Sequence, residues 1–138
     1  MQSQHKNKAF ATLLAAVTGG IGLHRFYLRG FSDPWGWLHA MSVPLTLGIT
    51  ALDFGQHGLF QAGALVLSVL AGFIEALVLG VTSDEKWDQT YNANSGKKSD
   101  SGWPVVLLLV LTLGLGASAL TAALARTFDL LFTGGAFG

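Results

Sequence analysis

Residues 102–125 read GWPVVLLLVLTLGLGASALTAALA and contain no charged side chain. A bilayer with a hydrocarbon core of about 30 Å needs about 20 predominantly apolar residues in an α-helix that crosses it. Residues 103–125 meet that length without including any charged neighbour. The stretch therefore predicts a membrane-spanning helix, and it decides the fold class in favour of an integral membrane protein.

Three other apolar runs precede this stretch. Residues 59–81 carry Glu75 as their single charged side chain, and residues 35–52 are barely long enough and contain Pro44, which predicts a kink. The first run ends in histidine and arginine, and it reaches membrane length only if the helix continues through them. We therefore predict an all-α fold, a bundle of four transmembrane helices at about 9–28, 35–52, 59–81 and 103–125.

The composition of the 138 residues agrees with this class. Hydrophobic residues make up 51% of the chain and charged residues 12%, where roughly 25% charged residues is typical of a soluble domain. Eight basic residues balance eight acidic ones, so no net charge indicates binding to nucleic acid. The sequence has no cysteine, no phosphate-binding loop and no residue set placed for nucleophilic catalysis. It therefore predicts no enzyme, no cofactor and no metal site.

One long polar segment, residues 82–102, separates the last two predicted helices. Ser83 precedes two acidic residues, which is the pattern of a helix N-cap followed by charges that suit the positive end of a helix. Trp87 and Tyr91 follow one turn apart, and such rings favour the membrane–water interface. The segment predicts a short interfacial helix at about 84–92. Interfacial anchoring is also expected of residues at the ends of the predicted spans, namely Phe26, Tyr27, Arg29, Trp35 and Trp103.

Small residues recur every four positions on the first and third predicted helices. They are Ala11, Ala15 and Gly19 on the first helix, and Ala64, Ser68, Gly72, Ala76 and Gly80 on the third. In lipid, such stripes are the usual contact faces because they let two helix backbones approach closely. Two alternatives stay open: packing within a single four-helix bundle, or packing between the subunits of a homo-oligomer.

Glu75 is the only carboxylate well inside a predicted span, where a charge costs roughly 2.5–3.5 kcal/mol and usually has a partner or a function. His24 and Arg25 lie near the end of the first predicted helix, and His39 lies near the start of the second. Antiparallel neighbours bring these residues and Glu75 to similar depths, about 3–5 Å apart at 1.5 Å per residue. We therefore predict a polar intramembrane cluster of His24, Arg25, His39 and Glu75. Because His24 and Arg25 point about 100° apart on a helix, they are not expected to face Glu75 in the same way.

Three uses of this cluster stay open. An arginine and a glutamate can neutralise one another and hold the bundle together, which is the expected role. A carboxylate beside imidazoles can relay protons, and two histidines with a glutamate can hold a metal ion such as zinc. Replacing Glu75 by glutamine separates the first use from the others through its effect on stability.

The orientation in the membrane follows from charge. Four spans place both chain ends and residues 53–58 on one face, with the three cations Lys6, Lys8 and Arg126. The other face holds the connections 29–34 and 82–102. It carries five cations: Arg25, Arg29, Lys86, Lys97 and Lys98. Because loops rich in lysine and arginine stay in the cytoplasm, residues 29–34 and 82–102 are predicted to be cytoplasmic.

Residues 6–30, KNKAFATLLAAVTGGIGLHRFYLRG, followed by an apolar helix, resemble the two-transmembrane (TM-two) domain family over about residues 6–52. The matching residues are Lys6, Lys8, Gly20, Gly22, His24, Arg25, Phe26, Tyr27, Leu28 and Gly30. Arg29 stands where the family usually has glycine. The resemblance implies a membrane-embedded helical hairpin whose motif-bearing loop faces the cytosol, and it implies no particular reaction or ligand. Residues 84–92, DEKWDQTYN, resemble a segment that follows the domain in bacterial members.

These observations predict a multi-pass protein of a bacterial inner membrane, surrounded by the lipid bilayer. The expected function is non-enzymatic, that of a structural, assembly or interaction protein, with a homo-oligomer as an open alternative. The alternative function is a small ion- or proton-conducting channel or transporter that uses the Glu/His/Arg cluster. Nucleic acid is not an expected partner, and the sequence indicates no particular protein partner.

Overall fold

The computed structural model describes residues 4–52 and 55–137, and every regular element in them is helical. In chain order the elements are α1 (Lys8–Thr18), a 3-10 turn η1 (Gly19–Ile21), α2 (Leu23–Arg29), α3 (Pro34–Leu52), α4 (Gly58–Gln61), α5 (Gly63–Val81), α6 (Asp84–Tyr91) and α7 (Trp103–Thr133). No strand occurs within these two ranges, so the all-α prediction is confirmed for them.

Two helices, α5 and α7, are long and apolar enough to cross a membrane. Helix α3 has the same length as α5, but His39 and two prolines make it less apolar. Helix α1 together with η1 is apolar but shorter than a span. The prediction of four membrane-spanning helices is therefore not confirmed.

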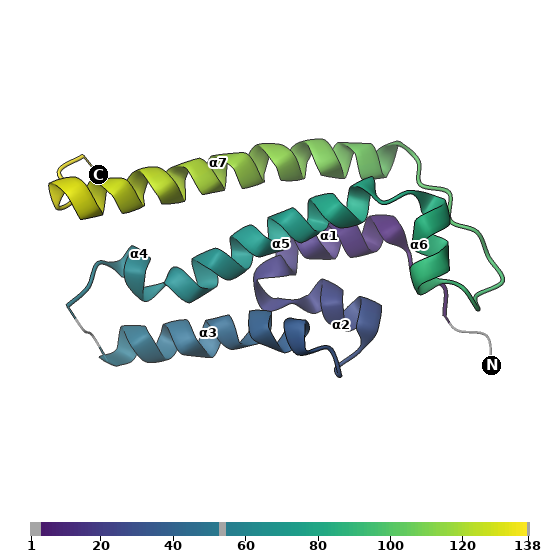
Figure 1. Cartoon of the computed structure of the whole chain (residues 1–138), viewed down its shortest axis with the longest axis horizontal. Helices are drawn as coiled ribbons and strands as arrows, with labels where there is room; N and C mark the ends of the chain where they lie inside the picture. The colour runs from purple at the N-terminus through teal and green to yellow at the C-terminus, as the bar shows by residue number, and fades with distance from the viewer. Residues whose placement is uncertain (1–3, 53–54, 138) are drawn as a thin grey trace.

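The predicted continuous helix over 9–28 is wrong, because the chain turns back on itself at residues 19–22. Helix α1 ends at Thr18, η1 tightens the chain, and Gly22 takes a φ of +75°, a conformation that favours glycine. Helix α2 then returns alongside α1, as Figure 1 shows. Residues 8–29 thus form a re-entrant hairpin, which enters the bundle and leaves it at the same end.

Contacts between the two arms fix this reversal. The backbone N–H of Asn7 donates to the Tyr27 hydroxyl oxygen at 2.8 Å, and the Lys6 ammonium donates to the Tyr27 carbonyl. The rings of Phe10 and Tyr27 meet edge to face with centroids 5.2 Å apart. Asn7 also caps α1, since its side-chain oxygen accepts from the Phe10 N–H at 3.0 Å. The start of α1 and the end of α2 therefore lie together.

The re-entrant hairpin packs against α5 by direct backbone contact. A Cβ added to Gly19 would lie 2.5 Å from the Gly72 Cα, so only glycine fits at this crossing. Buried in the structure are the predicted stripe residues Ala11, Ala15, Gly19, Ser68, Gly72, Ala76 and Gly80. Ala64, at the far end of the stripe, is half-buried. These buried stripe residues are therefore covered within a single chain.

Helices α5 and α7 run along most of the length of the molecule, whereas α3 runs from the end that holds α4 to about the middle, next to α2 (Figure 1). One end holds the start of α1, the end of α2 and all of α6, and we name it the α6 end. The opposite end holds α4 and the end of α7. The sequence predicts that both chain ends lie on the same face as residues 53–58. For the N-terminal end this prediction is wrong, because the reversal near Gly22 returns the chain to the α6 end, and the start of α1 stays there. Residues 53–54 lie outside the described ranges.

Helix α6 begins and ends within one residue of the predicted 84–92, and Ser83 caps it by accepting from the Lys86 N–H at 3.3 Å. The Lys8 ammonium donates to Asp84 at 2.7 Å, which ties the start of α1 to α6. Burial alone would raise the pKa of Asp84 from its usual 3.8, but hydrogen bonds from Lys8 and Ser101 outweigh burial and lower this pKa to about 2. The ion pair therefore persists in mildly acidic solution.

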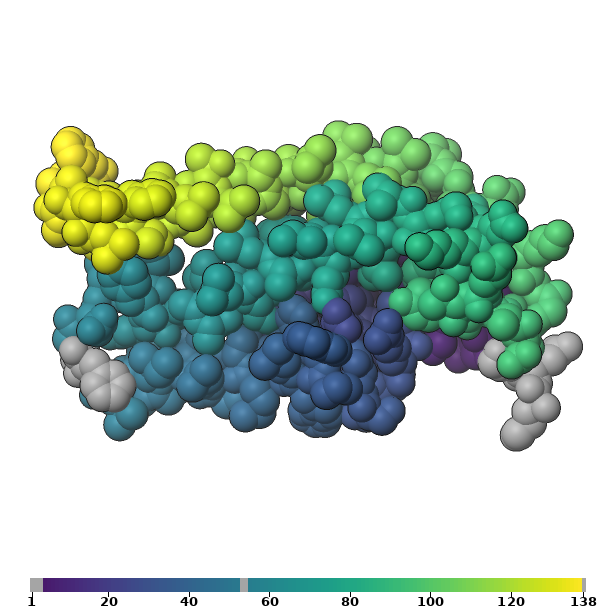
Figure 2. Space-filling model, in the orientation of Figure 1, coloured from purple at the N-terminus to yellow at the C-terminus, as the bar shows by residue number. Residues whose placement is uncertain are grey.

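The outer surface of the bundle is apolar. Figure 2 shows α7 uncovered along one edge of the molecule, with its last turns at the end opposite to α6. Large hydrophobic side chains that are more than half exposed include Ile74 on α5 and Val106, Val110 and Leu113 on α7. Continuous apolar surface of this kind is typical of contact with lipid or with another protein.

Candidate functional site

The structure brings His24, Arg25, His39 and Glu75 together inside the bundle. Glu75 comes from α5, His24 and Arg25 come from α2, and His39 comes from α3. His24 is 1% exposed and His39 is 7% exposed. One carboxylate therefore joins side chains from the re-entrant hairpin and from α3, and we name these four residues the polar cluster.

Arg25 lies between two carboxylates. Its Nε donates to both oxygens of Glu75, at 2.9 and 3.1 Å, and its Nη2 donates to one of them. Its Nη1 donates at 3.4 Å to Asp33, which is buried just before α3. Its guanidinium carbon lies 6.0 Å from the centre of the Trp35 ring, within cation–π range. Arg25 thus connects α2, the start of α3 and α5.

His24 reaches the same carboxylate as Arg25, since its Nε2 contacts Oε2 of Glu75. Both adjacent residues thus contact Glu75, but in different ways: His24 uses one ring nitrogen, whereas Arg25 uses Nε and Nη2 of its guanidinium. These contacts agree with the expectation that the two residues would not face Glu75 in the same way. The other ring nitrogen of His24, Nδ1, is buried without a hydrogen-bond partner among the described residues.

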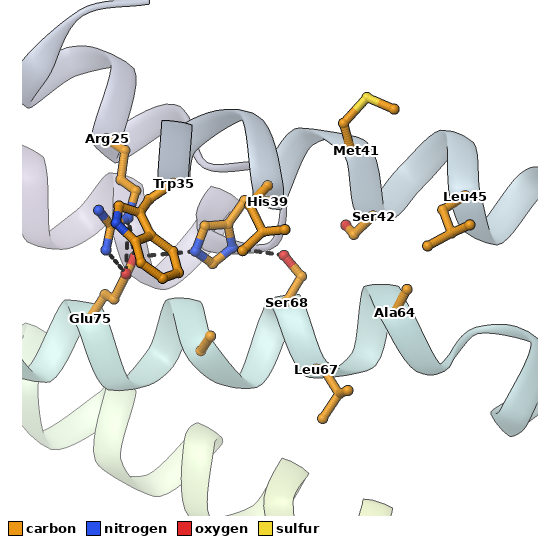
Figure 3. Close-up of a pocket in the computed structure, with 12 residues that line it drawn as sticks. Arg25, Trp35, His39, Met41, Ser42, Leu45, Ala64, Leu67, Ser68 and Glu75 are labelled. Carbon is orange, nitrogen blue, oxygen red and sulfur yellow. Dashed lines mark hydrogen bonds and ion pairs between the residues drawn. The ribbon is translucent and has the colours of Figure 1, made fainter. Parts of the chain in front are cut away.

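The turn of the re-entrant hairpin is connected to the polar cluster by hydrogen bonds. The Gly20 carbonyl accepts from the Ser68 hydroxyl at 2.7 Å and from the Ser42 hydroxyl at 3.2 Å. In an apolar environment a helix break is tolerated when side chains satisfy its backbone groups in this way. Ser68 also lies 2.7 Å from Nδ1 of His39, a contact drawn in Figure 3.

His39 lies between two polar partners, one at each ring nitrogen. Its Nδ1 is 2.7 Å from the Ser68 hydroxyl, and the tautomer of the ring decides which of the two donates. Its Nε2 is 3.5 Å from Oε2 of Glu75. An imidazole beside a carboxylate is a pair of groups that can exchange a proton, so the polar cluster contains the groups that proton transfer needs.

The polar cluster is not arranged as a metal centre. Across residues 4–52 and 55–137, no three His, Asp or Glu side chains are placed to hold a metal ion. Arg25 and His24 already contact the carboxylate of Glu75, and Ser68 already bonds Nδ1 of His39. A metal ion would have to replace these contacts.

A groove of about 550 Å³ opens between α3 and α5 beside the polar cluster (Figure 3). We name it the α3–α5 groove. Arg25, Trp35, His39 and Glu75 form its polar end. Its other lining residues are Leu38, Met41, Ser42, Leu45, Ala64, Leu67, Ser68 and Ala71. A smaller cavity of about 180 Å³ lies against His24, Arg29 and Tyr91, and Arg25 and Glu75 line both spaces.

The predicted interfacial anchors differ in exposure. Trp35 and Trp103 are 57% and 73% exposed, and Arg29 is also exposed. Three others, Phe26, Tyr27 and Tyr91, are half-buried. Trp87 is not a lipid-facing anchor, because it is fully buried within the chain. Its indole N–H donates to the Lys6 carbonyl at 3.1 Å, and its ring lies 4.6 Å from that of Tyr91.

Comparisons with protein-family models, with curated proteins and with solved structures found no match to this chain. The resemblance of residues 6–52 to the TM-two domain family therefore stays a prediction.

Proposed function

We propose that the chain is a non-enzymatic integral membrane protein, a structural or interaction component of the TM-two type, in which the Arg25–Glu75 pair holds the re-entrant hairpin in place. The observation that carries this proposal is the engagement of one carboxylate by side chains of α2 and α3. Such a contact fixes three elements with respect to one another. The carboxylate is engaged by these contacts, and no three His, Asp or Glu side chains among the described residues are placed to hold a metal ion.

A location in lipid is supported by length, surface and charge. Helices α5 and α7 have the length and hydropathy of membrane spans, and their exposed side chains are apolar. Glu75 lies about 9 Å from the end of α5 at 1.5 Å per residue, so it would lie within the hydrocarbon. A carboxylate at that depth needs a partner of opposite charge, and Arg25 provides it. Helix α3 would cross beside α5, and the re-entrant hairpin would enter from the α6 end.

The direction of insertion follows from the placement of cations. Seven of the eight lysine and arginine residues lie at or near the α6 end, and the eighth, Arg126, lies towards the other end of α7. The seven are Lys6, Lys8, Arg25, Arg29, Lys86, Lys97 and Lys98. This asymmetry is larger than the sequence alone indicated, because the reversal brings Lys6 and Lys8 to the α6 end. The α6 end would therefore face the cytoplasm, in the inner membrane of a bacterium.

Single-cysteine labelling tests this arrangement, since the natural sequence has no cysteine. We expect a membrane-impermeant maleimide added to intact cells to label Gln56→Cys at the end opposite to α6. Gln4→Cys and Lys97→Cys, both at the α6 end, are expected to react only after the membrane is opened. If one of Gln4→Cys and Lys97→Cys were labelled in intact cells and the other only after the membrane is opened, the two positions would lie on different sides, and the re-entrant hairpin would be contradicted. Recovery of the chain outside the membrane fraction would contradict the membrane location.

Proton conduction is a second candidate function, favoured by the contact between Nε2 of His39 and Glu75. Both groups can carry a proton, and Arg25 and Glu75 line two neighbouring spaces. The candidate predicts proton uptake by proteoliposomes under an applied potential. Glu75→Gln would abolish the uptake, whereas Glu85→Gln, which changes an exposed carboxylate of α6, would preserve it. Absence of flux in the natural protein across a range of pH and potential would exclude this function.

A further inference from the structure

We propose that the smaller cavity beside the polar cluster is filled with water and joins Glu75 to the aqueous solution at the α6 end. We name it the α6 cavity. The inference rests on the proposed membrane location. It adds to that location a route by which water and protons reach the carboxylate on α5.

The lining of the α6 cavity suits water better than an acyl chain. Five of its eight lining residues carry a charged or polar side chain: His24, Arg25, Arg29, Glu75 and Tyr91. A buried water typically makes about three hydrogen bonds to such groups. Guanidinium N–H groups, carboxylate oxygens and a phenol hydroxyl can supply these bonds, whereas an acyl chain would leave the same groups unsatisfied.

The two arginines of the lining keep N–H groups for water. Arg25 directs Nε–H and one N–H of Nη2 to Glu75, and one N–H of Nη1 to Asp33, so its other N–H groups stay available. Arg29 has no hydrogen-bond or ion-pair partner within residues 4–52 and 55–137. The charge of Glu75 is matched by Arg25. The unpaired charge of Arg29 is costly away from water, so it favours a hydrated cavity.

The α6 cavity has room for several waters and extends from the polar cluster towards the α6 end. Its volume is about 180 Å³, whereas one water needs at least about 10–15 Å³. On α5 the lining runs from Glu75 to Leu79, about 6 Å at 1.5 Å per residue, and the helix ends two residues later at Val81. On α2 the lining runs from His24 to Arg29, the last residue of that helix. Water in the α6 cavity therefore covers most of the depth between Glu75 and the end of α5.

Helix α6 contributes Tyr91 to the lining, and the rest of the chain holds this helix in place. The Tyr91 ring lies 4.6 Å from the ring of Trp87, which is fully buried and donates to the Lys6 carbonyl. The Lys8 ammonium also donates to Asp84 at the start of α6. These contacts fix the position of Tyr91, so the α6 cavity keeps its shape while α6 stays docked.

A hydrated α6 cavity changes what the polar cluster can do. Water beside Glu75 lowers the cost of a charge at this depth, because desolvation makes up most of that cost. The same water lets Glu75 exchange protons with the solution at the α6 end. For the candidate function of proton conduction, the α6 cavity would therefore be the cytoplasmic entrance.

The test measures how fast single cysteines react with a small, water-soluble methanethiosulfonate reagent in membranes opened to both sides. Only a thiolate reacts, and a thiol in apolar surroundings stays protonated. Leu79→Cys lies one turn from Glu75, and Leu28→Cys lies one turn from His24. Both thiols would meet water in the α6 cavity, and each is expected to react at least about tenfold faster than a thiol in lipid.

Leu77→Cys is the matched control. Leu77 is half-buried on the same helix as Leu79, but it lines an apolar cavity of about 220 Å³ between α5 and α7. Ile74→Cys tests the lipid-facing surface of α5, where Ile74 is 63% exposed. Both controls are expected to react slowly. Lys97→Cys, which is exposed in the connection between α6 and α7, is expected to react fast and shows that the reagent is active.

Slow reaction of both Leu79→Cys and Leu28→Cys would overturn the proposal, and so would equal rates for Leu79→Cys and Leu77→Cys. The two positions in the α6 cavity lie on different helices, so one supplies the result if the other variant does not fold. Failure of the membrane location is read separately, because Ile74→Cys would then react as fast as Lys97→Cys. That result would also remove the premise of the proposal.

Discussion

Glu75→Ala is expected to lower the free energy of unfolding by about 3 kcal/mol, at the lower end of the range of about 3–5 for breaking a buried ion pair. The loss arises because Arg25 stays in the bundle without its main partner, and His24 loses its acceptor. The lower end applies because Asp33 still contacts Arg25. Unfolding followed by circular dichroism in detergent micelles measures the change.

Two further variants separate the ion pair from other effects of the substitution. Glu85→Gln removes an exposed carboxylate from α6 and is expected to leave stability unchanged. Arg25→Met combined with Glu75→Met removes both charges together, and it should cost less than the sum of the two single replacements. Unchanged stability of Glu75→Ala, or additive losses in the double variant, would show that the pair does not hold the re-entrant hairpin.

Gly72→Ala is expected to cost about 1–3 kcal/mol, the usual price of overpacking a well-packed contact. The new Cβ would lie 2.6 Å from the Gly19 Cα and 2.7 Å from its carbonyl carbon. Both are backbone atoms, so the clash is relieved only by moving the re-entrant hairpin away from α5. That movement also separates the Gly20 carbonyl from Ser68. Faster hydrogen exchange in residues 8–29 would accompany the loss of stability.

Gly114→Ala is the matched control for this substitution. Gly114 also lies inside a helix, but a Cβ added there meets no atom within 4 Å. Alanine is the better helix former, so the control variant should be at least as stable as the natural chain. Equal stability of Gly72→Ala and Gly114→Ala would mean that the crossing of Gly19 and Gly72 is not a tight contact.

The polar cluster was predicted from a topology that is partly wrong. The four residues come together if the end of the first predicted segment, the start of the second and the end of the third lie at one face. Those three ends do meet at the α6 end, and Glu75 therefore lies beside His24, Arg25 and His39. The position of the start of the first segment does not affect this meeting of ends, so the chain reversal at residues 19–22 leaves the four residues together.

The reversal itself had a signal in the sequence. Glycine just after a helical run is a common termination signal, and Gly19, Gly20 and Gly22 supply three in close succession. The hydropathy pattern favours a continuous helix in spite of these glycines, because the apolar run continues through Leu23. A membrane span also requires about 20 residues, which favours extending the helix further. Segment length alone therefore favoured a continuous helix where the chain turns.

Other helix ends were missed for local reasons. Helix α7 continues to Thr133 rather than ending at residue 125, since Arg126 and Asp129 form an ion pair one turn apart that stabilises a helix. The segment predicted as 59–81 is divided at Ala62 into α4 and α5. The α3–α5 groove could not be predicted, because its volume depends on how the side chains of two helices meet in space.

The re-entrant hairpin also has a consequence for biosynthesis in the membrane. If residues 8–29 spanned the bilayer, Lys6 and Lys8 would lie on the side opposite to residues 29–34. Under the proposed membrane location, the reversal would keep both lysines on the side where the ribosome delivers them, and α3 would be the first segment transferred across. Because α3 is less apolar than α5, its insertion would depend on α5 following it. The translocation machinery would then receive α3 and α5 as a pair.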